Sequence, residues 1–476
     1  MKALKVLMII SFTLFLFCCT TSVQEQSNPY VKYKEDGSIE LFDGRVIPPL
    51  PKLLGMREQY ELRSKWLEKK HDMLLPMMRK YGIEMWIIVN DEFRHDPATE
   101  YVAPPRVYDD RREMHIFIDA GDKGLKRFSN YSRPTTDYEK FFEPFPVERS
   151  PRGTQDAAAG LKVMYETYNP KTIALNFGSR KGQANGLTHN SYLYLAETLS
   201  PEAEKRFVPA EELMEEYFDS RLPEELEFYR KQVFVTDVLA QRALSNVVIT
   251  PGVTTVVDLK WWWYQQIASL GVGAKPWFTI HTNVQRFDPE TGIITPWKDP
   301  APDEHVYQPG EVIHMDCGFN YLGFATDWQK VAYILQEGED DAPEGLKAAL
   351  QNANITQEAL ITACRPGMTG HEAASATIKK LEGVDFIPDI YSHAIGYQGH
   401  AMGPSVNARR LKLGPPPKRD SILRLGSYRS IELAAITKIP EWNMGLLRVP
   451  LEDDAYLTET GYEWFRPPQT SWYLIK

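Results

Sequence analysis

The sequence predicts an α+β protein of two domains, preceded by an export signal and a polar lead-in. Its 476 residues suit two domains once an N-terminal segment is removed. Strand-like and helix-like segments alternate over residues 51–215, which is typical of a small α/β domain. Two similar units follow within residues 221–476, and each is an apolar helix that runs into a Pro-Gly turn. This repetition predicts an internally duplicated α+β domain.

Composition sets the broad class. Hydrophobic residues make up 43% of the chain and charged residues 25%, which is enough apolar material for a sizeable packed core. The 54 basic and 64 acidic side chains give a net charge of −10. A mildly acidic protein has no electrostatic reason to bind nucleic acid, so none is expected as a partner.

Residues 1–19 have the proportions of a secretory signal. Lys2 and Lys5 precede an apolar run from Val6 to Phe17 that is too short to span a bilayer. Cys18 and Cys19 follow and resemble the processing site of bacterial lipoproteins, with Cys19 as the lipid acceptor. We therefore expect an exported protein of a bacterium, periplasmic or on the outer membrane, that touches the membrane only through its N-terminal lipid. Plain secretion and an uncleaved anchor are the alternatives. Residues 20–50 are polar and are expected to form a tether.

The cysteine count excludes a small disulfide scaffold. Beyond residues 1–19, the chain contains only Cys317 and Cys364. Cys317 lies inside a strand-like motif, so both are expected to be buried free thiols, with a disulfide between them as the alternative.

The first domain is expected to contain one long helix and several strands. The helical pattern covers residues 56–81 and is interrupted at Pro76. The strand candidates are 83–90, 112–119 and 172–178, with a helix around 154–168.

The second domain begins at residues 221–232, where Pro223 and the acidic residues after it indicate a helix start. The repeated turns are ITPGVTT (249–255) and CRPGMTG (364–370). Chance repetition of a common dipeptide is the alternative to duplication.

Two strand-like segments, VIHMDCGF and FATDWQKVAYIL, flank the turn-like NYLG within residues 311–335. If Asn320 pairs with Gly323, then Asp316 pairs with Asp327, and directly opposed residues project from the same face of a hairpin. Two carboxylates at such a short separation in an apolar sheet need a counter-charge, which a divalent cation supplies. Exposed acids on a polar hairpin and an acid–base carboxylate pair are the alternatives.

Three further segments carry metal-ligand side chains. SHAIGYQGHAMGPSV (392–406) holds His393 and His400 among glycines that allow close backbone approach. Glu432 lies in the strand-like SYRSIELAAI, and Glu452 opens EDDAYLTETG. A buried glutamate within a strand needs a partner. Two Asp, one His and two Glu form an oxygen-rich set that suits Mn²⁺, Co²⁺ or Zn²⁺.

These motifs resemble the pita-bread metallopeptidases. DCGFNYLGFATD is similar to the family's Asp-x-Gly…Tyr-x-Gly-x-x-x-Asp, GHAMG to its Gly-His-x-x-Gly, and SIEL and LEDDAYLTETG to its two glutamate strands. The resemblance covers about residues 221–470. The N-terminal α/β domain resembles the extra domain of the creatinase, prolidase and aminopeptidase P branch. The implied activity is removal of an N-terminal residue from peptides, as in an Xaa-Pro aminopeptidase or dipeptidase.

The resemblance implies a role for each residue. Asp316 would bind one metal, Asp327 and Glu452 would bridge two, and His400 and Glu432 would complete the second site. Glu432 would also handle a proton. A hydroxide between the two metals, with Mn²⁺ as the first choice, would attack the scissile carbonyl.

The sequence also departs from the family pattern. Asn407 stands where the aminopeptidase P branch has a catalytic histidine, and Trp328-Gln329 replaces its Thr-Arg. His281 or His305 would take the place of a substrate-binding histidine, and His393 that of a proton relay. An alignment anchored on His393-x-x-Gly would instead put Tyr397 at the metal position. These departures concern proline specificity and leave the five residues for two-metal hydrolysis in place.

Two other functions compete with a peptidase. One is a creatinase-like hydrolase without metal, and the other is a non-catalytic binding protein on the same scaffold. The aromatic run WWWY (261–264) is expected to be core or the contact of a homodimer.

Overall fold

The structure is a computed structural model of the chain. It describes residues 28–476 apart from 106–110, 132–137, 296, 298–299 and 418. The export signal and Cys19 lie outside the described residues, so lipidation stays a prediction. Among the helices that the structure describes, none combines the length and the apolar character needed to cross a membrane.

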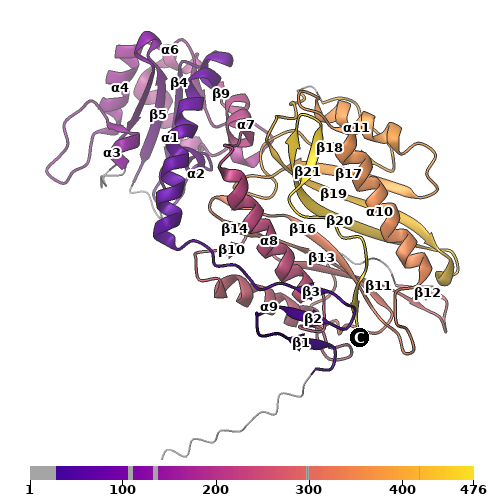
Figure 1. Cartoon of the computed structure of the whole chain (residues 1–476). Coiled ribbons are helices and arrows are strands. Elements are labelled where there is room, and N and C mark those ends of the chain that lie inside the picture. The colour runs from indigo at the N-terminus through magenta and orange to yellow at the C-terminus, as the bar shows by residue number, and fades with distance from the viewer. Residues whose placement is uncertain (1–27, 106–110, 132–137, 296, 298–299, 418) are drawn as a thin grey trace, which may run out of the picture.

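The described chain begins with a small antiparallel sheet. Its strands are β1 (Val31–Tyr33), β2 (Ile39–Leu41) and β3 (Val46–Ile47). Ile39, Leu41 and Ile47 are buried against Val238 of the C-terminal domain. The tether predicted over residues 20–50 is therefore wrong for this segment, which folds back onto the protein because it carries its own apolar face (Figure 1).

The N-terminal domain is a six-stranded sheet covered by helices (Figure 1). The strand order is β7-β6-β5-β4-β8-β9, and the three predicted strands are the neighbours β5, β4 and β8. Pro76 lies inside the first helix without ending it. The strands are β4 (Met85–Asn90), β5 (Glu113–Asp119), β6 (Leu125–Ser129), β7 (Glu143–Pro144), β8 (Ile173–Leu175) and β9 (Phe207–Pro209). The helices are α1 (Met56–Lys80), α2 (Thr99–Val102), α3 (Tyr138–Phe141), α4 (Ala157–Tyr168), α5 (His189–Leu199), α6 (Pro201–Glu204) and α7 (Glu211–Asp219).

The C-terminal domain is built on a ten-stranded sheet. Its order is β12-β11-β13-β16-β20-β19-β17-β18, with β21 beside β20 and β22 beside β16. The strands are β11 (His281–Asp288), β12 (Ile293–Ile294), β13 (Glu311–Cys317), β16 (Trp328–Ile334), β17 (Ile387–Ala394), β18 (Val406–Arg409), β19 (Tyr428–Ile439), β20 (Gly445–Thr458), β21 (Gly461–Trp464) and β22 (Tyr473–Ile475). A small sheet joins β10 (Lys275–Pro276), β14 (Phe319–Tyr321) and β15 (Phe324–Ala325).

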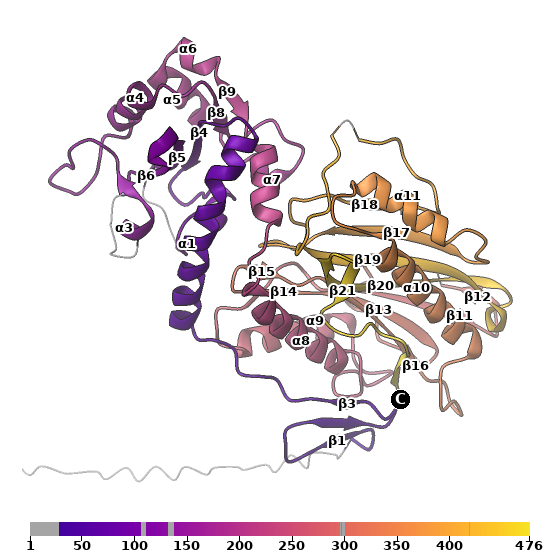
Figure 2. The same ribbon diagram turned by 45° about the horizontal axis from the view of Figure 1, so that its top comes forward.

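Two helix pairs cover this sheet and repeat each other. They are α8 (Glu225–Ala243) with α9 (Val256–Ser269), and α10 (Glu344–Ala363) with α11 (Gly370–Lys380). Thr255 caps α9 and Thr369 caps α11, each through a reciprocal capping box directly after the Pro-Gly turn. Figure 2 shows the two pairs beside different parts of the sheet. The predicted fold class, an α/β domain followed by a duplicated α+β domain, is confirmed.

Side chains alternate between the two faces of a strand, so the candidate ligands point to one face of the sheet and the apolar side chains to the other. On β13, Ile313, Met315 and Cys317 enter the core with α8 and α9, so Asp316 must face the opposite way. On β20, Leu451 packs in the core with α10, which directs Glu452 to that same open face. The helices therefore leave one face of the curved sheet available for a site.

Two smaller predictions concern buried side chains. Cys317 and Cys364 are both buried and free, as expected. Within WWWY, Trp263 is fully buried in the core, whereas Trp261 is 60% exposed. A homodimer stays a prediction.

Candidate metal centre

Five neighbouring strands place one row of polar side chains across the open face. Backbone pairing sets His281 opposite Asp316, Asp316 opposite Gln329, Gln329 opposite Glu452, and Glu452 opposite Glu432. Directly paired residues project from the same side of a sheet, so this register converts residues from distant parts of the chain into neighbours.

The hairpin between the two aspartates has a different register from the predicted one. Asn320 pairs with Ala325 rather than with Gly323, so Asp316 faces Gln329 and Asp327 lies diagonally across. The two-residue turn lies one residue further along the chain, because Leu322 and Gly323 both adopt positive φ, 55° and 82°, as a two-residue hairpin loop requires. Since strand side chains alternate with period two, the two-residue shift keeps both aspartates on one face.

Six side chains converge there as three overlapping groups of potential ligand atoms. Asp316, Asp327 and Glu452 form one group, and His393, Glu432 and Glu452 form another. Asp327, His393 and His400 form the third. Within each group the ligand atoms lie within 4.8 Å of one another.

The two histidines differ sharply in position. His393 is the penultimate residue of strand β17, and its side chain is only 4% exposed. Its Nε2 lies 3.4 Å from Glu452 Oε1, 3.5 Å from Glu432 Oε2 and 3.6 Å from Asp327 Oδ2. His400 stands in the loop beyond, 61% exposed, with its Nε2 3.8 Å from Asp327 Oδ2. His393 therefore occupies the centre of the cluster and His400 its edge.

Burial of several carboxylates together has electrostatic consequences. Burial, reinforced by the charges of Glu452 and Asp316, raises the pKa of Asp327 well above its ordinary value. Burial and the charge of Glu432 also raise the pKa of Glu452. Burial alone would lower the pKa of His393, but hydrogen bonding to Glu432 and Glu452 outweighs it and raises that pKa to about 9. Without a metal, the cluster thus gathers protons to offset its negative charge.

A first ring of hydrogen bonds orients the carboxylates. Ser430 Oγ donates to Glu452 Oε1. Asp454 Oδ2 accepts from the Tyr229 hydroxyl at 2.8 Å and from the backbone N–H of Asp327 at 3.4 Å. These hydrogen bonds orient the carboxylates, as metal sites require of the groups around their ligands.

A second chain of hydrogen bonds runs through Gln329. Asn283 Nδ2 donates to His314 Nδ1 at 3.1 Å, which leaves the His314 Nε2–H to donate to Gln329 Oε1 at 2.8 Å. With its oxygen so engaged, the Gln329 amide nitrogen faces Asp316 Oδ2 at 3.5 Å. Burial tends to raise the pKa of Glu432, but hydrogen bonding from His393 and from Gln329 outweighs burial and lowers it. The sequence showed Gln329 only as a departure from the family pattern.

The donor set fits divalent cations. Glu452 Oε2 is buried and has no hydrogen-bond partner in the described part of the chain. His393 Nε2 faces three carboxylate oxygens at 3.4–3.6 Å. Unsatisfied buried acceptors cost free energy unless a ligand completes them. Carboxylate oxygens with one imidazole suit Mn²⁺, Co²⁺ or Zn²⁺, and a bridging arrangement would accommodate two ions.

Of the histidines predicted to bind substrate, the structure brings one to the site. His281 lies directly opposite Asp316. The ring of His305 instead contacts Glu311, with its Nε2 2.9 Å from Glu311 Oε1, and it lies away from the cluster. Asn407 is exposed on β18, where it lines a separate surface hollow with His371.

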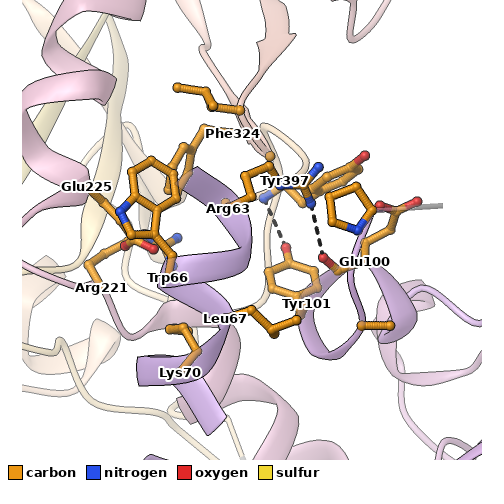
Figure 3. Close-up of a pocket in the computed structure, with 15 residues that line it drawn as sticks. Arg63, Trp66, Leu67, Lys70, Glu100, Tyr101, Arg221, Glu225, Phe324 and Tyr397 are labelled. Carbon is orange, nitrogen blue, oxygen red and sulfur yellow. Dashed lines mark hydrogen bonds between the residues drawn. The ribbon is translucent and has the colours of Figure 1, made fainter. Parts of the chain in front are cut away.

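The N-terminal domain holds the loop that carries His400. The Tyr101 hydroxyl accepts a hydrogen bond from the backbone N–H of Tyr397 at 3.0 Å, and Gln183 Nε2 donates to the His400 carbonyl at 2.7 Å. A cavity of about 70 Å³ lies between the domains. Figure 3 shows Tyr101 and Tyr397 among the residues that line it. The first domain thus helps to shape the mouth of the site.

Comparisons with known proteins agree with this architecture. Residues 235–459 match Metallopeptidase family M24. No curated protein sequence matches the chain significantly. An X-Pro aminopeptidase from Thermotoga maritima MSB8 superimposes with a TM-score of 0.60 at 18% identity, covering 84% of this chain and 99% of that one.

Two further structures show the same two-domain arrangement. The Xaa-Pro dipeptidase from Bacillus anthracis gives a TM-score of 0.58 at 16% identity over 86% of this chain and 100% of its own. An aminopeptidase P variant from Escherichia coli gives 0.55 at 16% identity over 87% and 95%. The C-terminal domain therefore matches metallopeptidase family M24 over residues 235–459, and the chain shares the two-domain pita-bread fold of those structures.

Proposed function

We propose that this protein is a two-metal peptidase that hydrolyses the N-terminal peptide bond of its substrates, with Xaa-Pro peptides as the first class to test. The convergence of Asp316, Asp327, Glu432, Glu452 and a buried imidazole on one face carries the proposal. The names of the similar structures support the substrate class. Five intact ligands disfavour both the metal-free hydrolase and the non-catalytic alternatives.

The geometry favours different roles for the two histidines from those expected. His393 is the better ligand because it is buried among three carboxylates that also hold the cations. His400 is better placed to contact substrate or to move a proton, since it is exposed at the edge of the cluster. The sequence contained a usable signal: His393 follows a strand-like run, and the carboxylate ligands also lie on or beside strands, whereas His400 stands in a glycine-rich loop.

The protein side chains would hold the cations and position the reacting groups. Two divalent cations bound there would polarise the scissile carbonyl and lower the pKa of a water molecule, so that a nucleophile exists at neutral pH. Asp327 and Glu452 each belong to two ligand groups, so each would help to hold the cations. Glu432 is placed to exchange a proton with the reacting groups, because it borders the open cavity beside Asp316.

The test combines metal analysis with activity. Purified protein supplied with Mn²⁺, Co²⁺ or Zn²⁺ should retain about two equivalents of metal and cleave peptides with and without proline at position two. Asp327→Ala should abolish turnover, because it removes a bridging ligand. Asp340→Ala, which changes a side chain that is 97% exposed, should leave turnover intact. Unchanged turnover in Asp327→Ala would remove this residue from the site.

We further propose that the protein is exported and anchored by lipid at Cys19, on the pattern of residues 1–19. Wild-type protein expressed in a bacterium should partition with membranes, and Cys19→Ser should release it. Equal partitioning of the two forms would contradict lipidation.

A further inference from the structure

A second candidate site lies away from the metal centre, in the cavity of about 70 Å³ between the two domains. Helix α1 of the first domain and the start of α8 in the second both line it. So do residues 322–324, in the turn that joins the two aspartate strands, and residues 396–397, in the loop that carries His400. A ligand bound here would touch both domains and two segments that shape the metal centre.

Two positively charged side chains approach each other at this cavity. Lys70 Nζ donates hydrogen bonds to the Tyr217 carbonyl at 3.0 Å and to the Ser220 carbonyl at 2.6 Å. Arg221 Nη1 also donates to the Ser220 carbonyl, at 3.0 Å. Because both groups bond the same oxygen, an ammonium and a guanidinium lie within a few ångströms of each other, and like charges that near repel each other.

One buried carboxylate offsets part of this charge. Glu225 is 5% exposed and lines the same cavity. Burial lowers the pKa of Lys70 to about 8, and the charge of Glu225 opposes this effect, so Lys70 keeps its proton at neutral pH. Asp219 also acts on Lys70, but it forms its own ion pair with Arg424 at 3.1 Å. At this end of the cavity, Lys70 and Arg221 therefore supply two positive charges against one negative charge.

The other charged residues of the lining balance each other. Arg63 and Glu100 carry one charge of each sign, and Arg63 Nη2 donates to the Glu100 carbonyl at 3.4 Å. Figure 3 shows Arg63 and Glu100 on the opposite side of the view from Arg221 and Glu225. The lining as a whole thus carries one positive charge in excess.

Both cations retain a hydrogen-bond donor for a ligand. An ammonium has three N–H donors, and Lys70 uses two of them on backbone carbonyls. Arg221 Nε is buried and has no hydrogen-bond partner among the described residues. A buried N–H without an acceptor costs free energy, which an acceptor in the cavity would recover. The volume gives space for a few water-sized groups, which suits an ion such as chloride or formate.

We propose that this cavity binds one small monovalent anion, held by Lys70 and Arg221, and that the anion strengthens metal binding at the neighbouring centre. Arg221 connects the two sites, because its Nη2 donates to the carbonyl of Ile395, two residues after His393. Its Cζ also lies 5.7 Å from the ring centroid of Phe324, in the turn of the aspartate hairpin. An anion that fixes this guanidinium would fix both segments, and bound metal would in turn tighten anion binding. The coupling rests on the proposed metal centre, whereas the anion site does not.

Thermal melts of the Mn²⁺-loaded protein at about pH 7.5 test the anion site. Sodium chloride or sodium formate replaces the sodium salt of 2-(N-morpholino)ethanesulfonate (MES) at constant ionic strength, and MES is a monovalent anion too large for the cavity. Chloride or formate should raise the Tm by about 2 °C or more relative to MES. A response to formate alone would identify the ligand as a small carboxylate, and a response to chloride would identify it as a simple inorganic anion.

Two variants should change this response in opposite directions. Lys70→Gln removes a positive charge and should raise the half-saturating anion concentration by about tenfold or more. Glu225→Gln removes the competing negative charge and should lower that concentration by about 3- to 10-fold. It keeps an oxygen for the Leu222 N–H, which Glu225 Oε2 accepts at 2.8 Å, and a folding defect would not tighten binding. Lys69→Gln is the matched control and should behave as wild type, because Lys69 is 60% exposed, pairs with Glu224 and does not line the cavity.

Competition with a chelator measures the coupling to the metal centre. Mn²⁺ affinity should be about fivefold or more higher in the active anion than in MES, and Lys70→Gln should abolish this difference. Equal Tm in all three salts, or the same response in wild type, Lys70→Gln and Glu225→Gln, would overturn the anion site. A Tm response with equal Mn²⁺ affinity in all salts would overturn the coupling. If the protein retains no Mn²⁺, the proposed two-metal function fails instead, and melts of the metal-free protein in the same salts decide the anion site.

Discussion

His393 and His400 show how two identical side chains in one short segment acquire different chemistry. The imidazole of His393 is buried against three carboxylates, and its pKa rises to about 9 in the metal-free protein. Partial burial, together with the nearby charge of His393, lowers the pKa of His400 to about 4. A neutral imidazole at the edge of the site is ready to accept a proton, while one at its centre must exchange its proton for a cation.

This difference predicts separate effects of the two alanine variants. His393→Ala should lose metal, because it removes a central ligand, and turnover should fall with the metal content. His400→Ala should retain close to the wild-type metal content but lose about 10²–10⁴-fold in kcat, as expected when a proton-handling group is removed. Metal analysis and kinetics on the same samples check this. Loss of metal in His400→Ala with full metal in His393→Ala would restore the original assignment.

Gln329 should position the ligands without touching the substrate. Its amide nitrogen faces Asp316, and its oxygen is held by His314. We expect Gln329→Ala to weaken metal binding or activity by about 10- to 100-fold, as is usual for groups behind metal ligands. Gln329→Glu should be worse, because its oxygens cannot donate to Asp316. Metal affinity measured by competition with a chelator distinguishes this from a simple loss of folding, and unaltered affinity in both variants would exclude the role.

At the scale of secondary structure, the sequence predicted which segments form strands but not how they align. The strand-like segments around Asp316, Glu432 and Glu452 all lie in the ten-stranded sheet. The hairpin register was missed because Leu322 takes a left-handed conformation, φ 55°, that residue preference does not indicate. The choice between His393 and His400 was missed for a related reason, since burial at the end of β17 depends on strands far away in the chain.

The hairpin also contains a glycine whose role can be tested. A Cβ at Gly318 would lie 2.0 Å from the Thr326 carbonyl oxygen and 2.5 Å from Trp277 Nε1. Because the first contact is with backbone, Gly318→Ala should force the strands carrying Asp316 and Asp327 apart. We expect a loss of about 1–3 kcal/mol in the free energy of unfolding, with weaker metal binding. Chemical denaturation measures the first effect.

Gly414→Ala is the matched control for this variant. A Cβ there would meet nothing within 4 Å, so stability should be unchanged. Equal stability of the two variants would show that the hairpin can adjust to a larger residue.

At the scale of the whole molecule, folding is coupled to the charge of the metal centre. The family resemblance predicted the two-domain fold, because the order of the motifs along the chain matches the family pattern even where individual residues differ from it. Two contacts were not visible in the sequence. Residues 31–47 pack against α8, and the Tyr101 hydroxyl accepts a hydrogen bond from the loop that carries His400. Both depend on contacts between segments that are far apart in the chain.

The pH dependence of stability follows from the shifted pKa values. Asp327 and Glu452 have raised pKa values in the folded protein, so as pH rises above their unfolded values of 3.8 and 4.5 their ionisation opposes folding. His393 is raised from 6.5 to about 9, so its contribution is complete below pH 6.5 and is lost as pH rises through about 9. Both effects have the same sign. Below pH 6.5 the lowered pKa values of His400 and His314 act in the opposite direction. Metal-free protein should therefore lose stability between about pH 6.5 and pH 9, by several degrees in Tm.

Divalent cations should reverse this trend, because they replace the protons as counter-charges and bind more tightly as the ligands ionise. Scanning calorimetry in a chelator and in Mn²⁺ at about pH 5.5, 7 and 8.5 tests both halves of the prediction. The two Tm curves should diverge as pH rises. Asp327→Asn, which removes one buried charge, should flatten the metal-free curve and reduce the gain from Mn²⁺. A metal-free Tm that climbs steadily with pH would mean that the buried carboxylates are balanced by charges other than His393, and the cluster would then have no electrostatic need for a metal.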